Sequence, residues 1–304
     1  MRSSFGQTYR GVLLSKYSRL SSPRQVSVNV VRAPLTVDKE EQFLAEVTTL
    51  GRVYHVNLCR LIGYCRQKNH RILVSPYAAG GSLYDRLHLT LEDRESGIPG
   101  AGVGGGGGGA GGGGGGGGDA LEMSIEGEEL GGGGSIDAVE RGGDEDNHLS
   151  SPLTLMERVV VALQIAEALR YLHYEVEPPV IHRDVKSLNV LLGEGGGTRL
   201  KAFLANFGLA EEMEEGLPSD DSTVSQLRCC GTPGYLAPEY LERGKLTRKV
   251  DVYGFGVVVL EMLTGKRAMI RCPTADEFRT LVEEGSNHLA AVDTVDLVDV
   301  LVLA

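Results

Sequence analysis

The chain has 304 residues, and its 41 acidic against 30 basic residues offer no positive field for a phosphate backbone, so we expect no nucleic-acid partner. Five cysteines lack the paired spacing of a metal site and the density of a disulfide scaffold, which favours a reducing compartment; they are Cys59, Cys65, Cys229, Cys230 and Cys272. No apolar run reaches the roughly 18 residues that span a bilayer and no signal pattern opens the chain, so we expect a cytoplasmic protein without a membrane segment.

The first 88 residues contain several strand patterns and two helical ones. Residues 5–12 predict a turn followed by a strand, and residues 25–31 alternate as a strand does. Residues 38–53 predict a helix because apolar side chains recur at helical spacing, namely Phe43, Leu44, Val47 and Leu50. Residues 71–74 predict a buried strand, and residues 80–87 open a short helix.

Residues 89–150 break this pattern. They hold 13 acidic and 2 basic residues, which leaves 28 of each sign in the rest of the chain. Between Gly97 and Gly134 lie 22 of the chain's 43 glycines. Such a segment cannot bury enough apolar surface to offset its ordering entropy, so we expect a disordered, acidic, glycine-rich insertion. It is either an inert spacer or an acidic docking arm.

The second half begins with a long helix from residue 153 to 173, whose expected core positions are Leu155, Val159, Leu163, Ala166 and Leu169. Residues 190–192 and 199–203 predict a hairpin. A polar loop spans residues 211–228, and an apolar helix at 251–263 ends at Gly265 and two cations, as helix C-termini commonly do.

Four short stretches carry a family resemblance. Residues 182–189, His-Arg-Asp-Val-Lys-Ser-Leu-Asn, resemble the catalytic loop of eukaryotic protein kinases, and a lysine at this offset is similar to the serine/threonine branch. Residues 204–210 resemble the D-F-G stretch with asparagine in place of aspartate, and residues 231–240 resemble the substrate-docking segment that ends in A-P-E. Residues 55–65 have the form common among plant receptor-like kinases. The resemblance covers residues 3–88 and 151 to about 272.

The resemblance implies an α+β, bilobal protein kinase-like fold, with a small β-rich lobe carrying one helix and a mostly helical large lobe. We assign residues 1–75 to the small lobe, 76–88 to the hinge and the start of the large lobe, 89–150 to the insertion, and 151–304 to the large lobe. Relative to the family, the first strand and the last helices are missing.

The resemblance also implies residue roles. Asp184 would accept the proton of a substrate hydroxyl, Lys186 would lie beside the transferring phosphate, and Asn189 would hold a metal ion. The docking and activation segment would comprise Thr232, Gly234, Tyr235, Pro238 and Glu239. Structural roles fall to His182, to Arg183, which reads an activation-loop phosphate in this family, and to Asp251, which anchors the catalytic-loop backbone. Candidate phosphorylation sites are Ser219, Ser222, Thr223 and Ser225.

The expected ATP site departs from the family at two positions. Asn29 stands where a lysine contacts the phosphates, so Glu46, the partner of that lysine, has no cation, and Asn206 replaces the aspartate that binds the metal. The other expected ATP-binding residues are Gly6, the third glycine of the glycine-rich loop, Ser27 on the lysine strand, Tyr77 and Ala78 in the hinge, and Leu191 below adenine.

Three functional readings follow. The favoured reading is a pseudokinase, a signalling or scaffold module with weakened ATP and Mg²⁺ binding and a protein partner. The second is an active protein serine/threonine kinase in which Arg2, Arg10 or Lys16 replaces the missing cation. The third is a truncated fragment, for instance of a receptor whose kinase portion lies on the cytoplasmic side of a membrane.

Overall fold

The computed structural model describes residues 6–14, 24–31, 34–88, 122–123, 134–135, 152–195, 199–213, 229–271 and 278–288. The chain divides into two compact units. Unit 1 comprises Met1–Thr36, Leu61–Tyr77 and Leu89–Glu145, and unit 2 comprises Val37–Arg60, Ala78–His88 and Asp146–Ala304. The helix predicted at residues 38–53 therefore groups with unit 2, whereas the sequence analysis assigns it to the small lobe.

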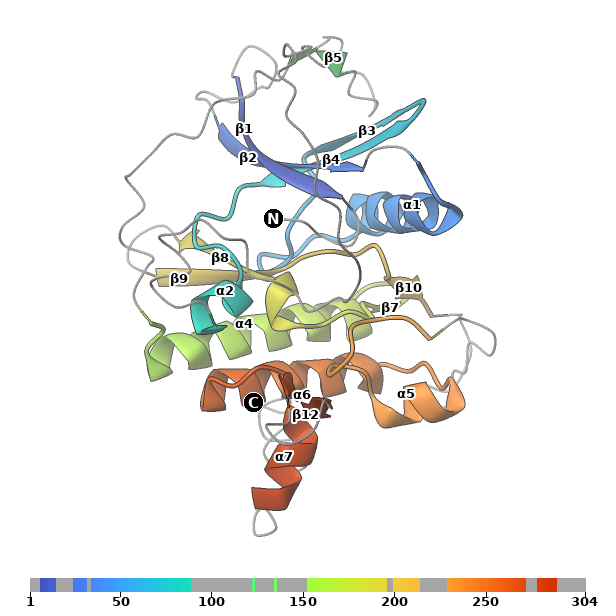
Figure 1. The fold of residues 1–304 in the computed structure, drawn as a ribbon. Coiled ribbons are helices and arrows are strands. Elements are labelled where there is room, and N and C mark those ends of the chain that lie inside the picture. Colours follow the sequence, from blue (N-terminus) through green and yellow to red (C-terminus); the bar gives the residue numbers. More distant parts are fainter. Residues whose placement is uncertain are drawn as a thin grey trace, which may run out of the picture. The chain divides into compact units, whose positions relative to one another are not determined.

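Unit 1 is built on a four-stranded antiparallel sheet with the order β1-β2-β4-β3 (Figure 1). Its strands are β1 (Gln7–Leu13), β2 (Arg24–Val31), β3 (Gly63–Gln67) and β4 (His70–Pro76). Alternate residues of β2 are buried in one cluster with β3 and β4, namely Val26, Val28, Val30, Cys65, Ile72 and Val74. Because strand side chains alternate, Ser27 and Asn29 lie on the opposite face of the sheet.

Two dipeptides of the predicted insertion belong to the described residues. They are β5 (Glu122–Met123) and β6 (Gly134–Ser135), and they pair antiparallel, with Glu122 opposite Ser135. The remainder of the predicted insertion, and the expectation that it is disordered, lie outside the described residues.

Unit 2 is mainly helical, with short strand pairs (Figure 1). Its described helices are α1 (Val37–Arg52), α2 (Leu83–His88), α4 (Leu155–Tyr174), α5 (Pro238–Arg243), α6 (Lys249–Thr264) and α7 (Leu281–His288), with the 3₁₀ turn η3 (Ser187–Asn189). Its strands are β7 (Val180–Ile181), β8 (Val190–Gly195), β9 (Arg199–Leu204), β10 (Glu211–Glu212), β11 (Met269–Arg271) and β12 (Phe278–Thr280). The pairs are β8 with β9, β7 with β10, and β11 with β12.

Helix α4 begins at a capping box. The Thr154 side chain accepts from the Glu157 backbone N–H at 3.3 Å, and the Glu157 carboxylate accepts from the Thr154 N–H at 2.8 Å. These bonds satisfy two N–H groups that a helix start otherwise leaves unpaired. They also lower the pKa of Glu157, because they stabilise its charged form.

The buried face of α4 differs from the predicted one. Leu155, Val159 and Leu163 are exposed. The core of unit 2 instead takes a neighbouring stripe, which packs with Phe255 and Met262 of α6; it comprises Val161, Ala162, Ile165, Ala168, Leu169 and Leu172. Leu169 lies in this core as predicted and Ala166 packs against it, whereas the prediction was wrong for Leu155, Val159 and Leu163. Helix α4 is apolar on more than one side, so periodicity alone could not identify the face that meets α6.

The described residues include no helix that is both long enough and apolar enough to cross a membrane.

Candidate active site

The catalytic-loop candidates lie between β7 and β8, and Asp251 of α6 holds the start of this loop. Its two carboxylate oxygens accept from the backbone N–H groups of His182 and Arg183, each at 2.8 Å. His173 Nε2 lies 2.8 Å from the same carboxylate. Burial alone would raise the pKa of Asp251, but the bonds from His173 and His182 lower it below its ordinary value. A buried anion therefore fixes the backbone just before Asp184.

Arg183 is the strained residue of this loop. Its φ is 67°, in the left-handed region that side chains rarely adopt. The backbone bond to Asp251 and the burial of its side chain hold it there. His182 packs edge-on against Phe207 with ring centroids 4.8 Å apart, and its Nε2 lies 3.1 Å from the Ala205 carbonyl oxygen. Burial lowers the pKa of His182, which favours the neutral ring.

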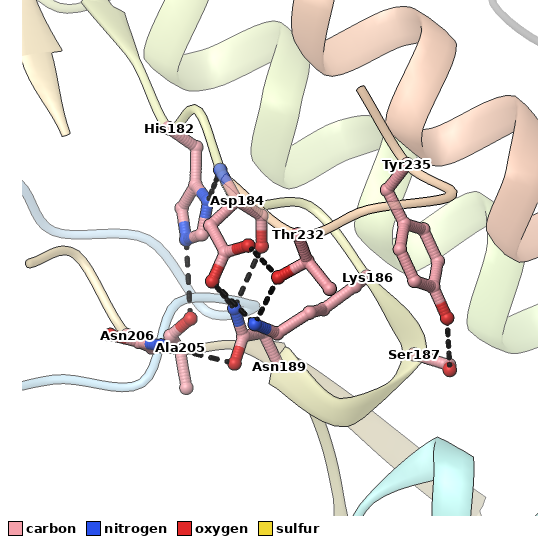
Figure 2. A network of polar contacts seen from close by, with 9 residues as sticks. All are labelled: His182, Asp184, Lys186, Ser187, Asn189, Ala205, Asn206, Thr232 and Tyr235. Carbon is pink, nitrogen blue, oxygen red and sulfur yellow. Dashed lines mark hydrogen bonds and ion pairs between the residues drawn. The ribbon is translucent and has the colours of Figure 1, made fainter. Parts of the chain in front are cut away.

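Asp184 is the centre of a closed polar network (Figure 2). Lys186 Nζ donates to Asp184 Oδ2 and to Thr232 Oγ1, each at 2.6 Å, and Thr232 Oγ1 donates to Asp184 Oδ1 at 2.6 Å. Asn189 Nδ2 donates to Asp184 Oδ2 at 2.9 Å and to its backbone carbonyl at 2.7 Å. Both carboxylate oxygens are thus oriented by donors, as a residue that receives a proton at a defined point requires.

The two expected metal ligands, Asn189 and Asn206, form a hydrogen bond with each other. Asn206 Nδ2 donates to Asn189 Oδ1 at 3.2 Å (Figure 2). Asn206 has a φ of 70°, a conformation that asparagine and aspartate both tolerate. Among the described residues, no group of three or more His, Cys, Asp or Glu side chains is placed to hold a metal ion. Mg²⁺ takes oxygen ligands in near-octahedral geometry, usually including one or two carboxylates, whereas Asn189 and Asn206 each offer an amide oxygen.

Besides Thr232, the docking segment contacts the catalytic loop through Tyr235. Its hydroxyl lies 3.1 Å from Ser187 Oγ (Figure 2) and donates to Glu261 Oε2 of α6 at 2.8 Å. His88 Nε2 at the end of α2 lies 3.0 Å from Glu261 Oε1, and both side chains are almost completely buried. Burial and the nearby carboxylate raise the pKa of Tyr235 well above its ordinary value.

His88, Glu261, Tyr235 and Ser187 form a connected set of polar contacts. Of these four residues, the sequence analysis had named only Tyr235 as a candidate. A glutamate inside the apolar run at 257–263 was the available signal, because a buried carboxylate requires polar partners. The other docking residues lie nearby in sequence: Gly234 has a φ of 89°, Pro238 starts α5, and Glu239 lies in the first turn of that helix.

In unit 1, Asn29 lies between Thr8 of β1 and Leu73 of β4 on one face of the sheet. Its Oδ1 is buried and accepts no hydrogen bond from the part of the chain that the structure describes. Gly6 lies so close that a Cβ there would be 2.8 Å from this oxygen. Ser27 lies opposite Arg10, and the backbone N–H of Tyr77 donates to the Gln25 carbonyl at 3.3 Å.

Glu46, Ala78 and Leu191 belong to unit 2. Glu46 is half-buried, and desolvation raises its pKa to about 7, although a hydrogen bond from the Phe207 backbone partly offsets this. The Ala78 carbonyl accepts from the Gly81 N–H at 3.1 Å. Leu191 lies in β8, opposite Phe203 of β9 and bridged to Ser82. Of the expected residues, the network around Asp184 thus unites Asp184, Lys186, Asn189, Asn206 and Thr232.

A β-rich unit, a helical unit and a polar loop fixed by a buried aspartate have the architecture of a protein kinase domain. The chain belongs to the protein tyrosine and serine/threonine kinase family, whose family model matches residues 2–301.

Three Arabidopsis thaliana proteins illustrate its relatives. PTI1-like tyrosine-protein kinase 2 is 32% identical over 264 residues, which cover 87% of this chain and 54% of that protein. A probable LRR receptor-like serine/threonine-protein kinase is 33% identical over 266 residues, 88% of this chain and 21% of that protein. Serine/threonine-protein kinase PBL27 is 33% identical over 265 residues, 87% of this chain and 38% of that protein. The chain spans about half of the first relative and less of the other two.

Proposed function

We propose that this chain is a receptor-like serine/threonine kinase domain with impaired phosphoryl transfer, acting as a pseudokinase signalling or scaffold module. The observation that carries the proposal is the bond between Asn189 and Asn206. In this family an aspartate stands at the position we assign to Asn206, and it binds the metal ion that bridges two phosphates. Here the Asn189 oxygen that would face a metal already accepts from Asn206, so a metal would have to break this bond and would gain no carboxylate.

The environment of Asn29 supports the same proposal. Its buried Oδ1 presents a partial negative charge with no donor among the described residues, at the position where the family places a full positive charge. Losing one preorganised electrostatic contact costs about 2.7 to 4 kcal/mol in the barrier, and two losses reduce the rate by about 10⁴ or more. We therefore propose weak or absent binding of ATP and Mg²⁺, with a protein partner as the ligand that matters.

The alternative is an active serine/threonine kinase, and the intact network of Asp184, Lys186 and Thr232 favours it. It requires a replacement for the missing lysine. Arg10 bonds Gln25 Oε1 at 3.0 Å and lies over the Tyr77 ring at 4.7 Å, so it would have to leave both contacts. Arg2 and Lys16 lie outside the described residues. A cytoplasmic location also remains a proposal.

Phosphate transfer from labelled ATP to a generic basic protein tests the proposal. The natural chain is compared with the double variant Asn29→Lys, Asn206→Asp, and Asp184→Ala sets the background. We expect the natural chain to match background and the double variant to exceed it. Activity of the natural chain above background would overturn the proposal. A silent double variant would show that the two amides are not what silences the domain.

A second readout needs no turnover. In Asn206→Asp a carboxylate would face Asn189 Oδ1, an arrangement of two acceptors that needs a cation between them. We expect MgCl₂ to raise the melting temperature of this variant and to leave the natural chain unchanged. At a Mg²⁺ concentration ten times the dissociation constant, the gain is about 1.4 kcal/mol.

A further inference from the structure

Helix α6 carries two buried carboxylates, and each is paired with a histidine from another helix. His173 of α4 lies 2.8 Å from Asp251, and His88 of α2 lies 3.0 Å from Glu261. All four side chains are buried. Asp251 holds the backbone at the start of the catalytic loop. We propose that Glu261 is a second anchor of this loop, a positioning residue that fixes residues 187–189 by way of the docking segment.

The hydrogen bonds that meet at Glu261 have a defined direction. Tyr235 Oη donates its single proton to Glu261 Oε2 at 2.8 Å. Ser187 Oγ, which lies 3.1 Å from Tyr235 Oη, is therefore the donor in that contact (Figure 2). His88 Nε2 donates to Glu261 Oε1. Both oxygens of a buried carboxylate thus have donors, and Ser187 is the member of this set that belongs to the catalytic loop.

Two routes lead from Tyr235 to Asp184. Its hydroxyl holds Ser187, which begins the η3 turn, and Asn189 at the end of that turn donates to Asp184. Its backbone N–H donates to the Thr232 carbonyl at 3.1 Å, and the Thr232 hydroxyl donates to Asp184. A displaced Tyr235 would therefore loosen the Asp184 network on two sides.

The Glu261 anchor also includes the end of α2. His88 is the last residue of this helix and directly precedes residues 89–150. The Tyr84 ring packs edge-on against the His88 ring, with centroids 4.7 Å apart. Because the imidazole is almost completely buried, it cannot turn away without leaving Glu261 Oε1 short of a donor. One buried carboxylate thus links α2, α6, the docking segment and the catalytic loop.

A double-mutant cycle on the full chain tests this link. His88→Leu and Ser187→Ala remove the two outer donors, which bond to different residues and not to each other. We expect urea unfolding to show non-additive effects, with a coupling of about fivefold in the unfolding equilibrium constant. In Glu261→Gln the coupling should fall to about one. Additive effects in the natural background, or the same coupling in folded Glu261→Gln, would overturn the proposal.

Hydrogen exchange separates positioning from a general loss of stability, and it needs only a mild variant. Tyr235→Phe keeps the ring and removes the hydroxyl. We expect the Asn189 backbone N–H to exchange about tenfold faster in this variant, while the His182 N–H, which Asp251 accepts, keeps its rate. Tyr171→Phe is the matched control, because that hydroxyl bonds elsewhere, to the Tyr54 N–H.

The same acceleration at residues 182 and 189, or none at 189, would contradict the role of Glu261. The inference goes beyond the proposed function, because neither measurement uses ATP or phosphate transfer. Its outcome is therefore independent of whether Asn29 and Asn206 silence the domain.

Discussion

Glu46 is a partly buried acid whose carboxylate is largely removed from solvent. It lies on α1, half-buried, where the Phe207 backbone donates to its carboxylate. Desolvation of the charged form outweighs this single bond, so the pKa rises from 4.5 to about 7. The folded state therefore binds the Glu46 proton more tightly than the unfolded state does. Near neutral pH this residue titrates, which a solvated helix carboxylate would not do.

Glu46→Gln should change how stability depends on pH. In the natural chain the contribution of Glu46 is fully favourable below pH 4.5, and it is lost as the pH rises from 4.5 to about 7, a change of about 3 kcal/mol at most. Glutamine stays neutral and can still accept from Phe207. Urea unfolding should therefore show equal stability at pH 4.5 and a gain of about 1 to 3 kcal/mol for the variant at pH 8.

The control is Glu41→Gln, at an exposed position of the same helix. It should leave the pH dependence of unfolding unchanged. The same slope for Glu46→Gln and the natural chain would show that burial does not shift the Glu46 carboxyl.

At the scale of elements, helix α6 shapes the catalytic loop through one face. Asp251 and Gly254, three positions apart, lie on the same side of the helix. Asp251 holds the backbone N–H groups of His182 and Arg183, and Gly254 makes room for Val185: a Cβ there would be 2.8 Å from its carbonyl oxygen. One face of α6 thus both accepts the backbone hydrogen bonds of this loop and leaves space for residues 182–185.

Gly254→Ala should destabilise the protein although alanine favours helices. The higher helix propensity of alanine stabilises the fold by about 1 kcal/mol. The contact of its Cβ with the loop backbone forces a shift that costs about 1 to 3 kcal/mol, and we expect this cost to exceed the gain. Gly51→Ala, near the end of α1, is the matched control because no described atom outside the helix's own backbone and the two chain neighbours lies within 4 Å of its added Cβ. Chemical denaturation should show a loss for the first variant and a gain for the second. A higher free energy of unfolding for both variants would mean that the loop moves away from the added Cβ at no measurable cost.

On the scale of the whole molecule, charge is distributed unevenly. The sequence places 13 acidic and 2 basic residues in 89–150, and 28 of each sign elsewhere. The helices α2 and α4 of unit 2 lie on either side of this segment in the sequence, and the side chain of His88, the last residue of α2, lies 3.0 Å from the Glu261 carboxylate. The composition therefore separates an acidic insertion from an electrically balanced kinase domain.

Shortening residues 89–150 to a ten-residue glycine–serine linker should preserve the fold. Loop-closure entropy predicts a gain in unfolding free energy of about 1.5 kcal/mol. Urea denaturation with circular dichroism measures it, and the melting temperature checks it independently. A loss of stability would contradict the prediction and would indicate that the segment packs against the domain.

The sequence alone identified the family, because the residues that carry it lie within short stretches such as 182–189 and 231–240. It also supplied the hypothesis that Asn29 and Asn206 replace a lysine and an aspartate of the family, and it named the candidates Asp184, Lys186 and Asn189. Most strands and helices followed from periodicity, which depends only on neighbouring residues.

The tertiary structure decided what depends on residues far apart in the chain. Thr232 meets Asp184 across 48 residues, and His88 meets Glu261 across 173. Periodicity placed Leu155, Val159 and Leu163 of α4 in the core although they are exposed, because only contact with α6 determines which apolar side of the helix is buried. Likewise, the burial that raises the pKa of Glu46 and the contact between Tyr235 and Glu261 arise from packing between distant segments, which no local pattern records.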